Sequence, residues 1–160
     1  MTLRDDIQTA FATNVYPGDD RLTVYDIAGR EYDETFQLLH GKTWREMPVA
    51  EFLGGDTPLP DLTAESFHYY LPALLIASID DTADFNADIA GKLMFHLSPT
   101  SASVGGEFAF DDVERYEHKM SLLTKCQRDV VIRALEEYVA RGWSEKNDIT
   151  KTIARLRERS

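Results

Sequence analysis

Polar side chains surround one proline of this sequence, where they could build a small chemical site. Pro72 lies within the apolar run from Thr63 to Asp81, which has the spacing of a helix. A proline inside a helix removes one amide donor and frees the carbonyl four residues earlier, here that of His68. The polar residues expected beside this carbonyl are His68, Tyr69, Tyr70 and His96. They would suit a small-ligand pocket, whereas the alternative is a kink that only bends the helix around the core.

Metal binding and nucleophilic catalysis are weakly supported by the sequence. Oxygen-bearing side chains alternate from Asp80 to Asp88 as in a calcium loop, but Phe85 and Gly91 stand where that loop needs a glycine and a bidentate glutamate. The four histidines are not at metal-ligand spacing on any one predicted helix. Cys126 lies beside two cations, which favour its thiolate, but the sequence fixes no partner histidine for it. We therefore expect no catalytic residue, no metal and no cofactor.

Charge gives a second indication of function. The formal net charge is −11, and residues 1–140 carry −14, with 11 Lys and Arg against 25 Asp and Glu. An acidic protein repels the phosphates of nucleic acid and attracts basic proteins. We therefore expect a basic protein partner and no nucleic acid. The predicted contact residues are acidic side chains and two aromatic anchors: Tyr16, Asp19, Asp20, Tyr69, Asp80, Asp81, Asp84, Asp111 and Asp112. The alternative for each carboxylate is a helix cap or a solvated turn.

The elements that must position these residues are predicted to be helices, in an all-α or mostly α fold with little or no sheet. The run from Thr63 to Asp81 is apolar on most of its circumference, which indicates a central, kinked helix covered by the others. Apolar spacing and capping residues predict further helices over about 2–13, 33–40, 48–53, 85–97, 111–120, 124–142 and 148–156. Long loops are expected at 54–61 and at 98–106, the latter as the most mobile internal stretch.

Local signals set the predicted ends of several elements. Three pairs have the spacing of a capping box: Thr2 with Asp5, Asp111 with Glu114, and Thr124 with Gln127. Glycines at 41 and 142 should end two of the helices. Between the first two helices, Pro17 and Gly18 predict a tight turn that presents Asp19 and Asp20.

Length and composition indicate one folded domain spanning residues 1–160, in which the helix within 143–160 could be peripheral. The chain has 43% hydrophobic residues, and its longest apolar run is too short to cross a membrane. The acidic N-terminus does not resemble a signal peptide, and a single cysteine suits a reducing compartment. These features predict a cytoplasmic protein with no membrane partner.

Four stretches resemble a family of small bacterial proteins of unknown function. They are Ala10 to Asp20 with its YPGDD motif, Gly41 to Pro48 (GKTWREMP), Thr63 to Ala73 (TAESFHYYLPA) and Phe95 to Pro99 (FHLSP). The resemblance covers residues 7 to about 140 and implies no assigned chemistry. By size, acidity and lack of catalytic motifs, the chain is also similar to immunity proteins that neutralise a toxin.

The leading hypothesis is a non-enzymatic, cytoplasmic binding protein of immunity or antitoxin type, which blocks a basic toxin or effector domain through its acidic surface. The alternative is an enzyme or small-ligand binder that uses a pocket at the kinked helix, near His68, Tyr69, Tyr70 and His96. The sequence leaves the oligomeric state open.

Overall fold

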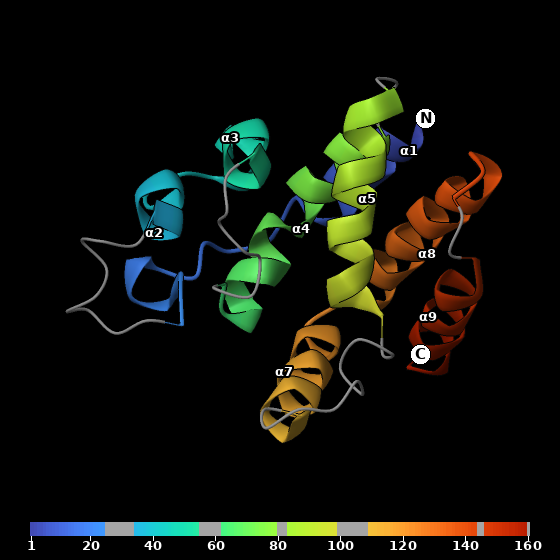
Figure 1. Cartoon of the computed structure of the whole chain (residues 1–160). Coiled ribbons are helices and arrows are strands. Elements are labelled where there is room, and N and C mark those ends of the chain that lie inside the picture. The colour runs from blue at the N-terminus through green and yellow to red at the C-terminus, as the bar shows by residue number, and fades with distance from the viewer. Residues whose placement is uncertain (25–33, 55–61, 80–82, 99–108, 144–145, 160) are drawn as a thin grey trace.

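Helices make up the fold of this chain. The computed structural model describes residues 1–24, 34–54, 62–79, 83–98, 109–143 and 146–159. The α-helices are α1 (Leu3–Ala10), α2 (Glu34–Leu39), α3 (Val49–Gly54), α4 (Ala64–Ile79), α5 (Ala83–Leu97), α7 (Ala109–Ser121), α8 (Lys125–Ala140) and α9 (Lys146–Glu158) (Figure 1). The described residues also include the 3₁₀ turns η1 (Asp19–Arg21) and η3 (Trp44–Glu46). Within these ranges, strand-type pairing is limited to an isolated bridge between Thr23 and Leu62. The all-α prediction is confirmed.

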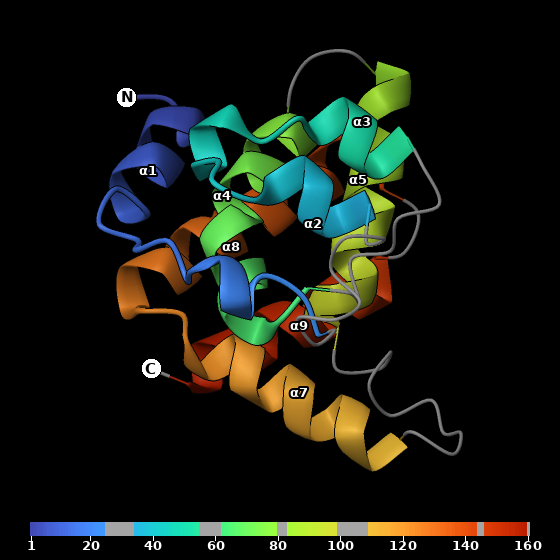
Figure 2. The same ribbon diagram turned by 90° about the vertical axis from the view of Figure 1, so that its left-hand side faces the viewer.

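Helix α4 is the central element, as predicted. It packs against α1, α3, α5, α7, α8 and the η3 turn, and Figures 1 and 2 show these elements on different sides of it. Four of its large apolar residues are buried: Phe67, Leu71, Leu74 and Leu75. Burying a leucine side chain of this kind contributes about 1.5–3 kcal/mol, so this one helix supplies a large share of the hydrophobic driving force. Pro72 lies inside this helix, which continues unbroken to Ile79.

Capping explains two of the helix starts. The Thr2–Asp5 box at α1 and the Thr124–Gln127 box at α8 are both present, with the reciprocal side-chain and backbone hydrogen bonds. The predicted box of Asp111 with Glu114 is wrong, because α7 begins at Ala109 and Asp111 is therefore already its third residue. The apolar face of α7 is formed by Tyr116 and Met120, which are buried, whereas Val113 is exposed.

Helix α8 ends in a Schellman motif. Gly142 has a φ of 88°, which a glycine adopts without a steric penalty. Its amide donates to the carbonyl of Val139, and the amide of Trp143 donates to that of Tyr138, both at 3.0 Å. The rings of Tyr138 and Trp143 then pack 6.5 Å apart between centroids. Gly142 thus turns the chain from α8 toward α9.

Helix α9 is part of the packed structure. Ile149 and Leu156 are buried, and the helix lies against α8 and α5 (Figure 1). Arg157 pairs with Glu136 of α8 at 3.0 Å, and Arg159 pairs with Glu117 of α7. The basic C-terminal segment therefore docks on acidic side chains of the preceding helices.

Several helix bounds differ from the prediction, those of α1 and α9 among them. Helix α1 ends at Ala10, since the following amides of Ala12 and Asn14 donate to carbonyls only three residues earlier and the chain turns away. Helix α9 starts at Lys146, two residues before the predicted start. The loops expected at 54–61 and 98–106 lie almost wholly outside the described residues.

Candidate functional site

The acidic turn at Tyr16–Asp20 is fixed by its own tyrosine. The Tyr16 hydroxyl donates to Oδ1 of Asp19 at 2.5 Å and accepts from the backbone N–H of Gly41 at 2.9 Å. Burial, followed by the hydrogen bond to Asp19, raises the pKa of Tyr16 to about 12. The phenol is therefore neutral at physiological pH, and it orients the carboxylate without cancelling its charge.

Glycine is required in this turn. Gly18 has a φ of 96°, and a Cβ placed there would lie 2.8 Å from Oδ1 of Asp20. Both aspartates that follow are exposed. Asp19 and Asp20 are thus presented to solvent, as predicted. The tight turn expected at Pro17 and Gly18 is not formed there, because Gly18 has a ψ of 150° and the chain turns over the next three residues, in η1.

Helix α4 holds the turn from the other side. The carbonyl of Arg21 accepts hydrogen bonds from the hydroxyls of Thr63, at 2.5 Å, and Ser66, at 3.1 Å. Thr63 also accepts from the Ser66 amide in the first turn of α4, so the same hydroxyl serves the helix start and the acidic turn. The η1 turn is consequently fixed to the N-terminal end of the central helix.

Three tyrosines join this turn to the core. The ring of Tyr69 meets that of Tyr16 edge-on at 5.6 Å and that of Tyr70 at 5.0 Å. The Tyr70 hydroxyl donates to the carbonyls of Leu39, at 3.0 Å, and Lys42, at 2.8 Å, and burial raises its pKa. Tyr69 is only 4% exposed, so it supports Tyr16 from beneath and would reach a partner only through it.

The structure therefore brings together four of the predicted contact residues, namely Tyr16, Asp19, Asp20 and Tyr69. Asp84 lies on α5, and Asp111 and Asp112 lie on α7, away from this turn in sequence and in element. Asp80 and Asp81 lie outside the described residues. Their part in a partner contact stays a prediction.

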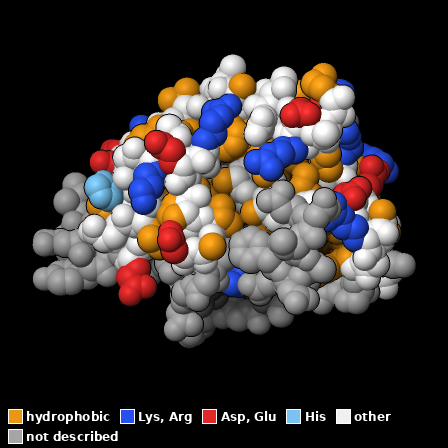
Figure 3. All heavy atoms as spheres, turned by 90° about the horizontal axis from the view of Figure 1, so that it is seen from above, with side chains coloured by type: hydrophobic (Ala, Val, Ile, Leu, Met, Phe, Trp, Pro, Cys, Tyr) orange, Lys and Arg blue, Asp and Glu red, His pale blue; other side chains and the backbone are white. Residues whose placement is uncertain are grey.

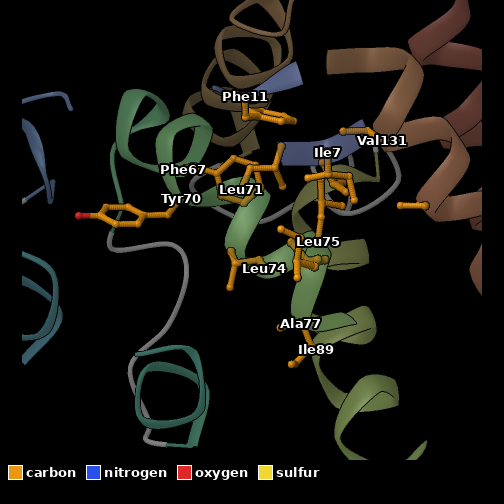
Figure 4. Packing of buried hydrophobic residues seen from close by; sticks show 14 of the residues in the cluster. Ile7, Phe11, Phe67, Tyr70, Leu71, Leu74, Leu75, Ala77, Ile89 and Val131 are labelled. Atoms are coloured by element: carbon orange, nitrogen blue, oxygen red, sulfur yellow. The ribbon is translucent and has the colours of Figure 1, made fainter. Parts of the chain in front are cut away.

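The residues of the alternative pocket find their partners on different elements. His68 places Nε2 2.9 Å from the side-chain oxygen of Gln127 on α8. Tyr70 bonds to the chain around α2 and projects to the opposite side from Val131 in Figure 4. His96 lies on α5, with its ring 5.9 Å from that of Phe67. These contacts do not converge on a shared ligand position.

The carbonyl freed by Pro72 has a partner that the sequence did not reveal. The side-chain amide of Asn14 donates to the carbonyl of His68 at 3.2 Å. Gln127 in turn donates to the Asn14 side chain at 2.8 Å and to the carbonyl of Ala10 at 3.2 Å. The network joins α1, α4 and α8, and 54 residues separate Asn14 from His68, so no local pattern predicts it.

A second polar group lies where α4, α5 and α7 meet. The ammonium of Lys119 is 3.4 Å from Nδ1 of His96 and 4.8 Å above the ring of Phe67. Burial, and then the charge of Lys119, lower the pKa of His96 to about 3, so this imidazole stays neutral. On the same helices, Nε2 of His118 lies 3.0 Å from the carboxylate of Glu65. No sequence pattern predicts the Lys119–His96 pair or the His118–Glu65 pair.

The described part of the chain has neither a metal-binding cluster nor a membrane-spanning helix. No group of three or more His, Cys, Asp and Glu side chains there is arranged to hold a metal ion. Cys126 is exposed in the first turn of α8. Among these residues, no helix has both the length and the apolar character needed to cross a bilayer.

Comparison with known proteins gives one match. Neither the curated proteins nor the solved structures include a similar chain. Residues 19–157 match a family of unknown function, DUF6714, which agrees with the resemblance noted from the sequence motifs. Since this match spans most of the 160 residues, the chain belongs to the DUF6714 family.

Proposed function

We propose that this protein is a non-enzymatic binding protein of immunity or antitoxin type, which neutralises a basic toxin or effector domain. The observation that supports this most directly is the acidic turn, defined here as residues 16–20, in which a neutral phenol orients the carboxylate of Asp19. An oriented, exposed carboxylate is suited to accept a charge-assisted hydrogen bond from an arginine or lysine of a partner.

The charges of the C-terminal helices favour the acidic turn over other acidic surfaces. Many carboxylates of α7 and α8 already face arginine or lysine side chains: Glu117 with Arg159, Asp129 with Lys125, Glu136 with Arg157 and Glu137 with Arg141. Such pairs reduce the local negative potential. On the face in Figure 3, Lys and Arg also alternate with Asp and Glu. The partner of Asp19, by contrast, is an uncharged hydroxyl.

Aromatic and apolar groups beside the carboxylates add to the proposed contact. Tyr16 is half-buried, with its ring braced by Tyr69, and Val15 next to it is 84% exposed. Rigid tyrosines flanked by charge are common centres of protein interfaces, because little side-chain entropy is lost on binding. The proposed interface therefore combines one braced ring, one exposed valine and two carboxylates.

The setting proposed for this activity is the cytoplasm of a bacterium. A single cysteine suits a reducing compartment, and an acidic protein with formal charge −11 favours basic protein partners over nucleic acid. Immunity proteins are typically encoded beside the toxins that they neutralise, so the product of the adjacent gene is the first partner to test.

The test is charge reversal in the acidic turn. Asp19→Lys with Asp20→Lys should slow association with the adjacent gene product by about tenfold or more at low salt, because steering by opposite charge is lost. The difference should shrink as salt rises. A matched control, Glu51→Lys with Glu114→Lys, makes the same change in net charge at two exposed residues on α3 and α7.

Two results would argue against the proposal. If the control slows association as much as the turn variant, the effect reflects net charge and not this surface. If both variants associate at the rate of the unaltered protein and retain protection in a toxicity assay, the acidic turn is not the interface. Thermal melting of each variant verifies that it remains folded.

A further inference from the structure

Helix α1 lies on α4 and α8 in the manner of a helical ligand in a groove. Ile7 and Phe11 are one turn apart, and both are fully buried. Figure 4 shows Ile7 beside Val131 of α8 and Phe11 close to α4. Leu3 and Ala10 complete the apolar stripe and pack against the same core. This i, i+3, i+4 spacing of anchors is the pattern by which amphipathic helices bind grooves.

Polar contacts fix the position and direction of α1 in this groove. At one rim, Asp6 pairs with Arg133 of α8 at 2.6 Å. At the C-terminal end, the Gln127 side chain donates to the carbonyl of Ala10, which the helix leaves without an internal donor. Asn14 then continues the network to the His68 carbonyl. The groove thus recognises both apolar anchors, one acidic side chain and one helix end.

The groove and its occupant belong to different parts of the chain. The family match begins at Asp19, so α4 and α8 lie inside it and α1 lies outside. Residues 11–18, which connect α1 to the η1 turn, contain no helix or strand, and Ala12, Thr13 and Val15 are exposed. In this chain, the groove between α4 and α8 is therefore filled by a helix that lies N-terminal to the matched residues.

We propose that the groove between α4 and α8 also accepts the α1 of a second copy of this chain, giving an exchanged dimer. Every contact of α1 described above is then made between copies instead of within one, in a closed two-fold arrangement. The contacts of α1 are the same in the single copy and in the exchanged dimer. The equilibrium between these two forms therefore depends on protein concentration and on the connecting segment 11–18. The partner is thus a copy that presents an aspartate one residue before the first of two apolar anchors.

The Asp6–Arg133 pair gives a direct test. Asp6→Arg and Arg133→Asp each place like charges across the rim, both within one copy and between identical copies. In a mixture, exchange of α1 between the two variants restores an opposite-charge pair in each groove. After joint refolding at high concentration, the heterodimer should exceed either homodimer by about tenfold, measured by native mass spectrometry.

The control is the chain carrying both substitutions, Asp6→Arg with Arg133→Asp, which restores the pair within one copy. It should dimerise no more than the unaltered protein. An equal yield of dimer in the mixture and in the separate variants, or no dimer in any sample, would overturn the proposal. Since both side chains are partly exposed, the single variants should remain folded.

Hydrogen exchange on the unaltered chain tests the same inference without substitution. The amides of α1 should exchange through a local opening, many times faster than those of α8, because exchange between folded copies requires α1 to leave the groove while the rest stays folded. Equal protection in α1 and α8 would mean that α1 leaves only on global unfolding, and would exclude exchange between folded copies.

Discussion

Asn14 supplies the hydrogen bond that Pro72 removes from α4. The proline has no amide proton to donate to the carbonyl of His68, and the Asn14 side chain donates to that carbonyl from 54 residues away, at 3.2 Å. Gln127 fixes the orientation of Asn14 by donating to its side-chain oxygen at 2.8 Å. A proline in the central helix is therefore tolerated because Asn14, held by Gln127 of α8, completes its hydrogen bonding.

The first prediction concerns this replacement. Asn14→Ala should destabilise the protein by about 1–3 kcal/mol, because a part-buried carbonyl loses its donor and Gln127 loses an acceptor. Urea unfolding with an unchanged m-value would measure the loss.

The control uses Pro72→Ala, which returns an amide to α4 opposite the His68 carbonyl. In that background, the cost of Asn14→Ala should fall by about 1 kcal/mol, since the carbonyl keeps a donor within the helix. Equal costs in the two backgrounds would show that Asn14 does not act through this carbonyl.

The second prediction compares two glycines. Gly142→Ala should cost about 1 kcal/mol, because its φ of 88° is unfavourable for alanine although nothing lies within 4 Å of the added Cβ. Gly91→Ala should instead be neutral or stabilise by up to about 1 kcal/mol, because Gly91 is inside α5 and the new Cβ would lie 3.4 Å from the Trp143 ring, an ordinary contact. Thermal unfolding of both variants would compare them, and an equal effect of the two substitutions would contradict this explanation.

Much of the fold can be predicted from local patterns in the sequence. Helix α4 is apolar on nearly all sides, so its burial at the centre follows from the sequence alone. Thr124 and Gln127 have the spacing of a capping box, and they form one. The positive φ of Gly18 likewise follows from glycine chemistry.

Contacts between distant segments could not be predicted in the same way. The bonds from Tyr16 to Gly41 and from Asn14 to His68 depend on how helices pack, which a single sequence does not encode locally. The start of α7 was misplaced because Asp111 with Glu114 imitates a capping box, whereas the helix continues two residues further toward the N-terminus. Three predicted contact residues lie in the acidic turn and Tyr69 of α4 packs beneath it, while others are on separate helices.

The third prediction concerns the pH dependence of stability above neutrality. The pKa of Tyr16 is raised to about 12 in the folded protein, whereas an unfolded tyrosine titrates near 10. The unfolded state therefore loses this proton first, so the contribution is complete below pH of about 10 and is lost as the pH rises toward 12. Tyr16→Phe should lower the free energy of unfolding at neutral pH. It should also make this free energy fall less steeply between pH of about 10 and 12. Denaturant unfolding of both proteins at several pH values would measure the difference, and parallel pH curves would contradict it.

The last prediction concerns the contact between α4 and α7. The hydrogen bond from His118 lowers the pKa of Glu65, so the folded protein holds the charged carboxylate more strongly than the unfolded chain does. A group with a depressed folded pKa contributes stability above its unfolded value, and that contribution is lost as the pH falls through its folded pKa. Glu65→Gln should therefore lower stability at pH 6 and reduce the loss of stability on acidification below about pH 4.5. The matched control is Glu114→Gln, at an exposed residue of α7 itself. It should leave the loss of stability on acidification unchanged. If both variants lose stability on acidification in the same way as the unaltered protein, the Glu65–His118 contact does not hold α7 to the central helix.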